Sequence, residues 1–242
     1  MKSNSASSSA SNHLSSGSLL HRLMSRGLAP CRARHCAIGL YHDHVLPLAL
    51  NRMMDTKQTR TIRSRVCAEL SGDVVEIGFG TGLNLPHLPS AVTALKAVDP
   101  MKRGRALARE RLVASPVDVE FVGLDGQRIP LDDDSVDSAL STWTLCSIPD
   151  PVAAVREIRR VLRPGGTLRF VEHGRSPNAR VFTWQQRLNP VQRRVAGGCT
   201  LDSDIAAIIV AGGLCIDHID TYYASGEPKT HGWTFEGSAH RT

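Results

Sequence analysis

The sequence predicts an α/β protein built on a mostly parallel, seven-stranded sheet with an antiparallel last strand. Three observations lead to this prediction. Short apolar runs alternate with amphipathic helical stretches, a glycine-rich turn follows the first run, and a short turn joins the last two runs. Alternation favours parallel strands with helices on both faces of the sheet, whereas a short turn requires an antiparallel pair.

The composition is that of an ordinary globular protein with a positive charge. The hydrophobic fraction is 41% and the formal net charge is +6. The basic residues are spread over helix faces, which favours solvated surfaces over an anionic partner. No apolar run approaches the roughly 18 residues that a membrane span needs. We expect a cytoplasmic protein, with organellar targeting as the less favoured alternative.

The cysteines indicate neither a metal site nor a disulfide framework. None lies in a Cys-x-x-Cys pair or in a Cys/His cluster with zinc spacing. In a chain of this length we expect reduced thiols and no bound metal. The six cysteines are Cys31, Cys36, Cys67, Cys146, Cys199 and Cys215.

Residues 1–38 differ from the rest of the chain. They are rich in serine, carry several arginines and contain no acidic residue. We expect a disordered tail. The alternatives are an organellar transit peptide and an over-extended start, with Met24 as the true initiator.

Residues 39–72 are predicted to form an N-terminal helical segment. Ile62, Val66 and Leu70 recur four residues apart and form one apolar stripe. Gly72 is placed to end the helix. A second apolar group is expected to pack on the body of the protein: Leu46, Leu48, Leu50, Met53 and Met54.

Residues 73–242 contain the alternating elements of the predicted domain. In the first part the expected strands are 74–77, 93–99, 117–123, 136–145 and 167–173, and the expected helices are 101–115 and 151–162. The sequence Arg-Pro-Gly-Gly at 163–166 is expected to end the second helix and to turn the chain into the fifth strand.

The last part of the chain departs from this alternation. Segment 176–199 is expected to be an irregular lid or substrate wall. A helix at 201–213 is expected to follow, with Thr200 as its cap. Strands 215–223 and 231–239 then close the domain. The apolar residues expected to line the lid are Phe182, Trp184, Leu188 and Val191.

The turn after the first strand carries the main chemical signal. In "VVEIGFGTG" glycine stands at every second position, as Gly78, Gly80 and Gly82. Glycine permits positive φ and lets a ligand approach the backbone, whose amides can hold an anionic group. The dinucleotide pattern requires a glycine where Leu83 stands. The turn is therefore expected to hold an amino-acid end rather than a pyrophosphate, with Gly82 serving the turn itself.

With the segments that follow it, this turn resembles the class I S-adenosylmethionine-dependent methyltransferases. The motifs involved are "VEIGFGTG", "AVDP", "LDGQRIPLDDDSVD" and "VLRPGG", and the resemblance extends over 41–239. It implies a Rossmann-like fold with S-adenosylmethionine as cofactor. The cofactor-binding residues that it implies are Glu76, Gly78, Gly80, Gly82, Asp99, Met101, Asp125, Gly126, Thr142 and Trp143.

The resemblance also assigns a role to most of these residues. Asp99 would accept the two ribose hydroxyls, as an acidic residue does in dinucleotide sites. Met101 would pack on adenine, and Asp125 would meet the adenine amino group. Thr142 and Trp143 would border the methionine moiety.

Within this class the sequence is similar to the methyltransferase-like 7 group of thiol methyltransferases and its bacterial relatives. The similarity lies in "TWTLCSIPDP", "FVEHG", "FTWQQRLNP" and "HGWTFEG". It implies a small methyl acceptor, either a thiol or a lipid-like amine. His173, at the end of the fifth strand, is the candidate base for such an acceptor. The Ser/Arg tail replaces the apolar anchor of the membrane-associated thiol enzymes, so any membrane contact is expected to be peripheral.

Two other classes of function remain open at this point. A non-catalytic S-adenosylmethionine-binding module would bind the cofactor without transferring its methyl group. A nicotinamide-dependent oxidoreductase is disfavoured by Leu83. No nucleic-acid partner is expected, because the chain lacks an Asn/Asp-Pro-Pro-Tyr-type base pocket and a separate basic domain. The sequence leaves the oligomeric state undetermined.

Overall fold

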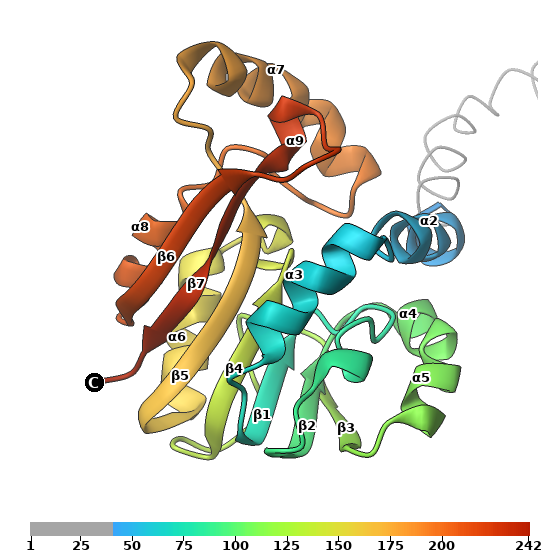
Figure 1. Cartoon of the computed structure of the whole chain (residues 1–242), viewed down its shortest axis with the longest axis vertical. Coiled ribbons are helices and arrows are strands. Elements are labelled where there is room, and N and C mark those ends of the chain that lie inside the picture. Colours follow the sequence, from blue (N-terminus) through green and yellow to red (C-terminus); the bar gives the residue numbers. More distant parts are fainter. Residues whose placement is uncertain (1–40) are drawn as a thin grey trace, which may run out of the picture. The chain divides into compact units, whose positions relative to one another are not determined.

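The computed structural model describes residues 41–242, which form one compact unit. The predicted tail at 1–38 lies outside these residues. The described chain folds around one sheet with the strand order β3-β2-β1-β4-β5-β7-β6 (Figure 1). The strands are β1 (Gly72–Ile77), β2 (Val92–Val98), β3 (Asp118–Gly123), β4 (Val136–Thr142), β5 (Leu162–His173), β6 (Cys215–Tyr223) and β7 (Trp233–His240).

The predicted direction of the strands is confirmed. Strands β1 to β5 pair in parallel, whereas β7 is antiparallel to both β5 and β6. The chain leaves β1 in one direction to form β2 and β3, and then crosses to β4 on the other side of β1. The carboxyl ends of β1 and β4 therefore flank the point where strand order reverses, which is the usual ligand site of an open α/β sheet.

Helices cover both faces of the sheet, and each face has its own hydrophobic core. Figure 1 shows α3 (Lys57–Cys67) in front of the sheet and α6 (Pro151–Val161) behind it. The other helices are α2 (Leu46–Met53), α4 (Lys102–Leu107), α5 (Arg109–Ala114), α7 (Ala179–Val195), α8 (Ile205–Ala211) and α9 (Lys229–Gly232), with a π-helical turn η1 (Tyr41–Val45) and 3-10 turns η2 (Leu85–His87) and η3 (Leu145–Ser147).

Alternation along β1 decides which side chains reach which face. Val75 and Ile77 belong to the core under α6 and α8, whereas Val74 belongs to the core under α3. Because successive side chains of a strand point to opposite faces, Glu76 lies on the α3 side. An acidic side chain is thus carried into the interior at the carboxyl end of the central strand, where it is 1% exposed.

The N-terminal helical segment is confirmed in type but is divided in the structure. The chain forms η1, α2 and α3 rather than one helix, and α3 ends at Cys67, before Leu70. Ile62, Val66 and Leu70 are buried as expected. The expectation for Leu48 and Met53 was wrong, because both side chains are largely exposed on α2.

Three further elements differ from the prediction. The helix expected at 101–115 is interrupted at Ala108, which ends α4 and precedes α5. Strand β4 stops at Thr142, three residues before the predicted end, because the chain turns there into η3. Strand β5 starts at Leu162 and so includes the predicted Arg-Pro-Gly-Gly turn.

The segment at 176–199 is helical over most of its length, so the expectation of an irregular insert was wrong. Asn178 caps α7 by accepting hydrogen bonds from the amides of Arg180 and Val181, and the helix continues past Pro190. Figure 1 shows α7 and α9 beyond the carboxyl ends of the parallel strands. No helix among residues 41–242 is long and apolar enough to cross a membrane.

The cap expected for the next helix was also wrong. Helix α8 starts at Ile205, and Asp204 caps it by accepting from the amide of Ala207. Thr200 instead donates hydrogen bonds from its amide and hydroxyl to the carbonyl of Cys146. It therefore ties the end of the α7 segment to the loop after β4.

Gly78→Ala and Gly165→Ala form a matched pair that tests the packing of the glycine turn. The two glycines have φ of +78° and +79°. A Cβ at Gly165 meets no atom within 4 Å, whereas one at Gly78 would lie 1.9 Å from Thr144 Oγ1. We expect Gly165→Ala to lower the free energy of unfolding by about 1–2 kcal/mol through backbone strain. Gly78→Ala should cost more, as measured by urea unfolding. Equal losses would contradict the close packing at Gly78.

Candidate active site

The glycine turn after β1 has the backbone conformation that only glycine adopts readily. Gly78, Gly80 and Gly82 all have positive φ. At Gly80 an added Cβ would have only the carbonyl oxygen of Gly78 nearby, at 3.9 Å, so this part of the turn faces open space. At Gly82 it would crowd Phe79, Ala108 and Leu85. The structure therefore leaves open space beside Gly80 and packs Gly82 against its neighbours.

Asp99 follows β2 and is fixed by two backbone amides. Its carboxylate oxygens accept hydrogen bonds from Gly80 N and Met101 N, each at 2.6 Å. Burial raises the pKa of Asp99 above its usual value, and the two amides oppose this shift. Each carboxylate oxygen has a second acceptor position, so the side chain keeps acceptor capacity.

A cavity of about 180 Å³ lies beside Asp99, between the ends of β2 and β3 and the start of α4. Met101 lines it, and the guanidinium of Arg105 stacks 3.8 Å from the ring centre of Phe121 in its wall. Gly104 lets α4 approach the glycine turn, since an added Cβ would lie 2.4 Å from Gly80 O. The structure thus groups Gly80, Asp99 and Met101 around one cavity.

Asp125 and Gly126 do not line this cavity. The Asp125 carboxylate is exposed and accepts hydrogen bonds from the amide and side chain of Gln127, which lower its pKa. Gly126 packs on the end of β1, where an added Cβ would lie 2.7 Å from Ile77 Cγ2. Val122, Gly123 and Leu124 supply the lining on this side.

A buried polar network joins Glu76 to α3. Asn84 Nδ2 donates to Glu76 Oε1 at 2.6 Å and to Thr142 Oγ1 at 3.0 Å. Arg63 Nη1 donates to Asn84 Oδ1 at 2.6 Å and to Thr142 Oγ1 at 3.0 Å. Glu76 Oε2 and Arg63 Nε have no hydrogen-bond partner among the described residues. The network therefore leaves one buried acceptor, Glu76 Oε2, and one buried donor, Arg63 Nε, without a hydrogen bond among the described residues.

Burial dominates the electrostatics of this network. It raises the pKa of Glu76 to about 7, against the hydrogen bond from Asn84 and the charge of Arg63. It lowers the pKa of Arg63 to about 10. Two charged groups held in this way without a direct ion pair are costly to bury, which is typical of a site that meets a polar ligand.

Sequence reasoning missed Arg63 and Asn84. Arg63 begins an i, i+3, i+4, i+7 pattern that Val66, Cys67 and Leu70 complete, so it occupies the buried face of α3. A charged residue in an apolar stripe needs a polar partner. The position of Arg63 in this stripe could therefore have indicated a buried polar site. Asn84 carried no such signal, because it follows the glycine turn in an ordinary loop.

Trp143 lies between Arg63 and His173. It has a φ of +51°, which is rare for a residue other than glycine, and its amide donates to Val171 O at 2.7 Å. The guanidinium of Arg63 lies 4.8 Å from the centre of its ring. The ring of His173 lies 6.4 Å away between centroids. Trp143 thus stands between the buried network and the end of β5.

Glu172, on the neighbouring strand β5, fixes the chain where it leaves β4. Its buried carboxylate accepts from Ser141 Oγ at 2.7 Å and from the amides of Thr144, Leu145 and Cys146 at 3.0, 3.1 and 3.4 Å. Burial raises its pKa and these four donors oppose the shift. The chain after Trp143 is thereby wrapped around one carboxylate.

His173 meets two cysteines from distant parts of the chain. Cys146 Sγ and Cys199 Sγ are 3.6 Å apart, and one ligand atom from each of the three residues lies within 4.8 Å of the others. The pKa of Cys199 is lowered, chiefly by its hydrogen bond with Cys146 and also by His173, while that of Cys146 is raised. Sequence spacing could not reveal this group, since the cysteines are 53 positions apart.

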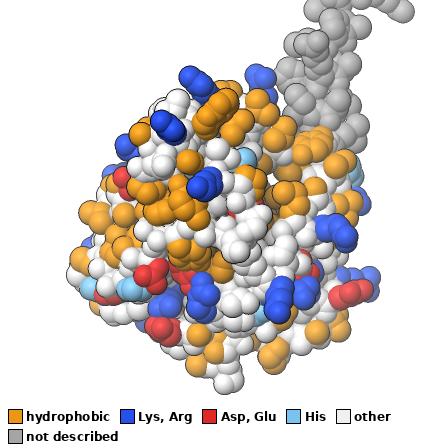
Figure 2. All heavy atoms as spheres, turned by 45° about the horizontal axis from the view of Figure 1, so that its top comes forward, with side chains coloured by type: hydrophobic (Ala, Val, Ile, Leu, Met, Phe, Trp, Pro, Cys, Tyr) orange, Lys and Arg blue, Asp and Glu red, His pale blue; other side chains and the backbone are white. Residues whose placement is uncertain are grey.

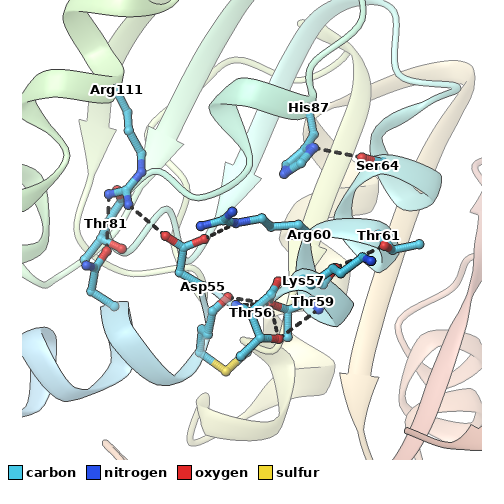
Figure 3. A network of polar contacts seen from close by, with 12 residues as sticks. Asp55, Thr56, Lys57, Thr59, Arg60, Thr61, Ser64, Thr81, His87 and Arg111 are labelled. Atoms are coloured by element: carbon cyan, nitrogen blue, oxygen red, sulfur yellow. Dashed lines mark hydrogen bonds and ion pairs between the residues drawn. The ribbon is translucent and has the colours of Figure 1, made fainter. Parts of the chain in front are cut away.

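A polar cluster outside the pocket fixes the glycine turn to the N-terminal helices (Figure 3). Asp55 accepts from Arg60 at 2.6 Å and from Arg111 at 3.4 Å. Arg111 also donates to the carbonyl of Thr81 at 3.1 Å. The connection between α2 and α3 is therefore linked through α5 to the backbone of the turn.

Comparison with known proteins agrees with this geometry. Residues 75–170 match the family model described as a methyltransferase domain. Human thiol S-methyltransferase TMT1B is 35% identical over 173 residues, covering 65% of this chain and 67% of that protein. A phosphatidylethanolamine N-methyltransferase of Cereibacter sphaeroides is 30% identical over 122 residues, covering 48% of this chain and 60% of that protein. The chain spans about half the length of several other curated relatives.

Solved structures support the fold. A methyltransferase from Aquifex aeolicus, described as S-adenosylmethionine-dependent, superposes with a TM-score of 0.58 at 17% identity, covering 81% of this chain and 98% of that one. The predicted enzyme class, fold and cofactor are confirmed. The chain belongs to the class I S-adenosylmethionine-dependent methyltransferases, in the family that contains human TMT1B.

Proposed function

We propose that this methyltransferase acts on a small molecule and that its acceptor atom is a thiol sulfur. The observation that carries this proposal is the similarity to human thiol S-methyltransferase TMT1B, which is 35% identical and covers 65% of this chain, more than the methyltransferase-domain model covers. The side chains at the end of β5 are compatible with it. Cys146, Cys199 and His173 form a small, mostly buried group with no fixed carboxylate among them.

The cofactor fits the chain at the glycine turn. When bound, S-adenosylmethionine supplies a methyl group that is already activated on a sulfonium. The unused Glu76 Oε2 suits the ammonium of an amino acid and the unused Arg63 Nε its carboxylate. Asp99 keeps acceptor positions for ribose hydroxyls, and Met101 lines the cavity that suits adenine.

The other predicted contacts remain part of the proposal. Gly80 lets the cofactor approach the backbone at the open part of the turn, whereas Gly78 would meet it only with main-chain atoms because Thr144 fills the space a Cβ would need. Thr142 and Trp143 border the methionine part of the cofactor. Asp125 would meet the adenine amino group from outside the lining of the cavity. Its Oδ1 accepts both bonds from Gln127, and Oδ2 is left for a ligand.

The chain contributes to the transfer mainly by positioning and by excluding water. Holding an acceptor in line with an activated methyl group supplies much of the lowering of the barrier. A thiol also has to lose its proton. His173 would accept that proton, since its Nδ1 is buried and has no hydrogen-bond partner among the described residues.

A lipid-like amine is the second candidate acceptor. Helix α7 exposes Trp184, Val191 and Val195 and carries Arg193 and Arg194 in its last turn. Figure 2 shows hydrophobic and basic side chains together on the face that this end of the molecule presents. An apolar surface with positive charge would suit an amphipathic acceptor at a lipid surface.

A radiolabelled-methyl transfer screen tests the acceptor class. Purified protein would be given labelled cofactor with a panel of alkyl thiols, amines and phenols and with lipid extracts. We expect transfer to thiols at least about tenfold faster than to amines. Preferred labelling of a lipid amine would replace the thiol by the second candidate. Cofactor binding without transfer to any acceptor would contradict both.

Asp99→Asn tests the proposed ribose contact. It removes the charge and places an amide beside two backbone N–H donors, so we expect S-adenosylmethionine to bind about 10–100-fold more weakly in isothermal calorimetry. Asp118→Asn is the matched control, because Asp118 is exposed at the start of β3. Unchanged affinity in Asp99→Asn, or equal losses in both variants, would refute the assignment.

The raised pKa of Glu76 predicts a pH dependence of cofactor binding. Without cofactor the carboxyl is largely protonated below pH 7. An ammonium placed beside it favours the carboxylate, so binding should release a proton and the affinity should fall by up to about tenfold per pH unit below 7. Calorimetry in buffers of different ionisation enthalpy measures both effects. Glu76→Gln should bind more weakly at neutral pH and lose this slope. A slope that persists in the variant would contradict the role of Glu76.

A further inference from the structure

The group formed by Cys146, His173 and Cys199 has the composition and spacing of a metal site. The residues come from η3, from the end of β5 and from the loop after α7. We propose that they bind a thiophilic divalent cation, Zn²⁺ above all, and leave one coordination position for the thiol acceptor. The acceptor part of this inference rests on the proposed function, whereas the metal site itself does not.

The distances fit tetrahedral coordination. Zinc binds thiolate sulfur at about 2.3 Å and imidazole nitrogen at about 2.0–2.1 Å, which puts tetrahedral ligands about 3.4–3.8 Å apart. The two sulfurs are 3.6 Å apart, and the ligand atoms of the trio lie within 4.8 Å of one another. The cysteines are free thiols at a separation far above the roughly 2.05 Å of a disulfide. Small side-chain rotations would complete the site.

An unpartnered ring nitrogen of His173 also favours a bound cation. Nδ1 of His173 is buried and has no hydrogen-bond partner among the described residues. A buried ring nitrogen without a partner is costly unless something binds it, and neutral imidazole is a common metal ligand. Two thiolates with one neutral imidazole would balance the charge of Zn²⁺, so the cluster could be buried without net charge.

Neighbouring residues hold the ligands in place. Thr200, next to Cys199, donates from its amide and hydroxyl to the Cys146 carbonyl at 2.8 and 3.0 Å. Glu172, next to His173, accepts from the amide of Cys146 at 3.4 Å. The segments that supply the three ligands are thus held to one another by hydrogen bonds next to the ligands.

Three protein ligands leave a fourth position, which is the arrangement of catalytic zinc sites. A thiol that coordinates zinc gives up its proton and is held as a thiolate. The sulfur–hydrogen proton passes to water. A sulfur–carbon bond then forms as the cofactor's methyl–sulfonium bond breaks, and that electron pair stays on the cofactor sulfur. No oxidant or reductant is needed. Zn²⁺ would then take over the acid–base task that the metal-free site leaves to His173.

Metal analysis of the full-length protein tests the site. The purified chain would be incubated with zinc chloride, freed of unbound metal and measured by plasma mass spectrometry, with affinity from competition against a chromophoric chelator. We expect about one zinc per chain, and at least about tenfold weaker binding in Cys146→Ser and in Cys199→Ser. Cys215→Ser is the matched control, because this cysteine is exposed on β6 and far along the chain from the trio.

A second measurement on the unmodified protein avoids variants that fail to fold. Cobalt should replace zinc and give the visible absorption of tetrahedral cobalt–thiolate coordination, which a thiol acceptor should change. Calorimetry with S-adenosylmethionine checks that each variant keeps its fold. Retained zinc in both trio variants, loss of zinc in Cys215→Ser, or a Cys146–Cys199 disulfide with no zinc uptake after reduction would overturn the metal site.

The acceptor part has its own readout. Chelator-treated enzyme should lose most thiol methylation and recover it with zinc, while its affinity for S-adenosylmethionine stays unchanged. Full thiol methylation by metal-free enzyme would overturn the open position. Zinc binding at the trio with no methylation of any thiol would instead refute the proposed acceptor and leave the metal site standing.

Discussion

Glu76 and Arg63 bring opposite charges into the interior at the carboxyl end of the sheet, and Asn84 and Thr142 join them. This network of four side chains positions the segments that supply them. It fixes α3 against β1 and β4, holds the segment after the glycine turn, and places Arg63 under the ring of Trp143. Because neither charge is fully satisfied, the fold bears a desolvation cost that a zwitterionic ligand would relieve.

Glu172 is a second buried carboxylate that fixes the chain around it, at the end of β5. One carboxylate gathers Ser141 and the three amides that follow Trp143, so the left-handed backbone of Trp143 is held between two fixed points. Strain of this kind persists only where surrounding contacts over-determine it. Trp143 therefore lies between Arg63 on one side and His173 on the other, with its backbone held in place.

Local sequence patterns predicted most of the fold. The apolar runs located the seven strands of residues 41–242 to within a few residues, except at the start of β5, and the short turn predicted the antiparallel pair. The glycine turn and Asp99 were predictable because their chemistry lies within a few consecutive residues. Arg63, Asn84 and the Cys146–His173–Cys199 group were not, since each depends on segments that meet only after folding. Helix α7 was missed because its Pro190 and its scattered apolar residues hid a helical period.

The hydrogen bonds from Thr200 to the Cys146 carbonyl bear on how the trio comes together. Cys199 and Thr200 lie just after α7, whereas Cys146 and His173 belong to the sheet and its exits, so the trio is complete only while the α7 segment is seated. Any outward swing that admits a bulky acceptor would separate the sulfurs. A small acceptor could bind to an assembled site, whereas a large one would wait for the segment to return. The size of the acceptor that reaches an assembled trio would thus depend on whether the α7 segment stays in place.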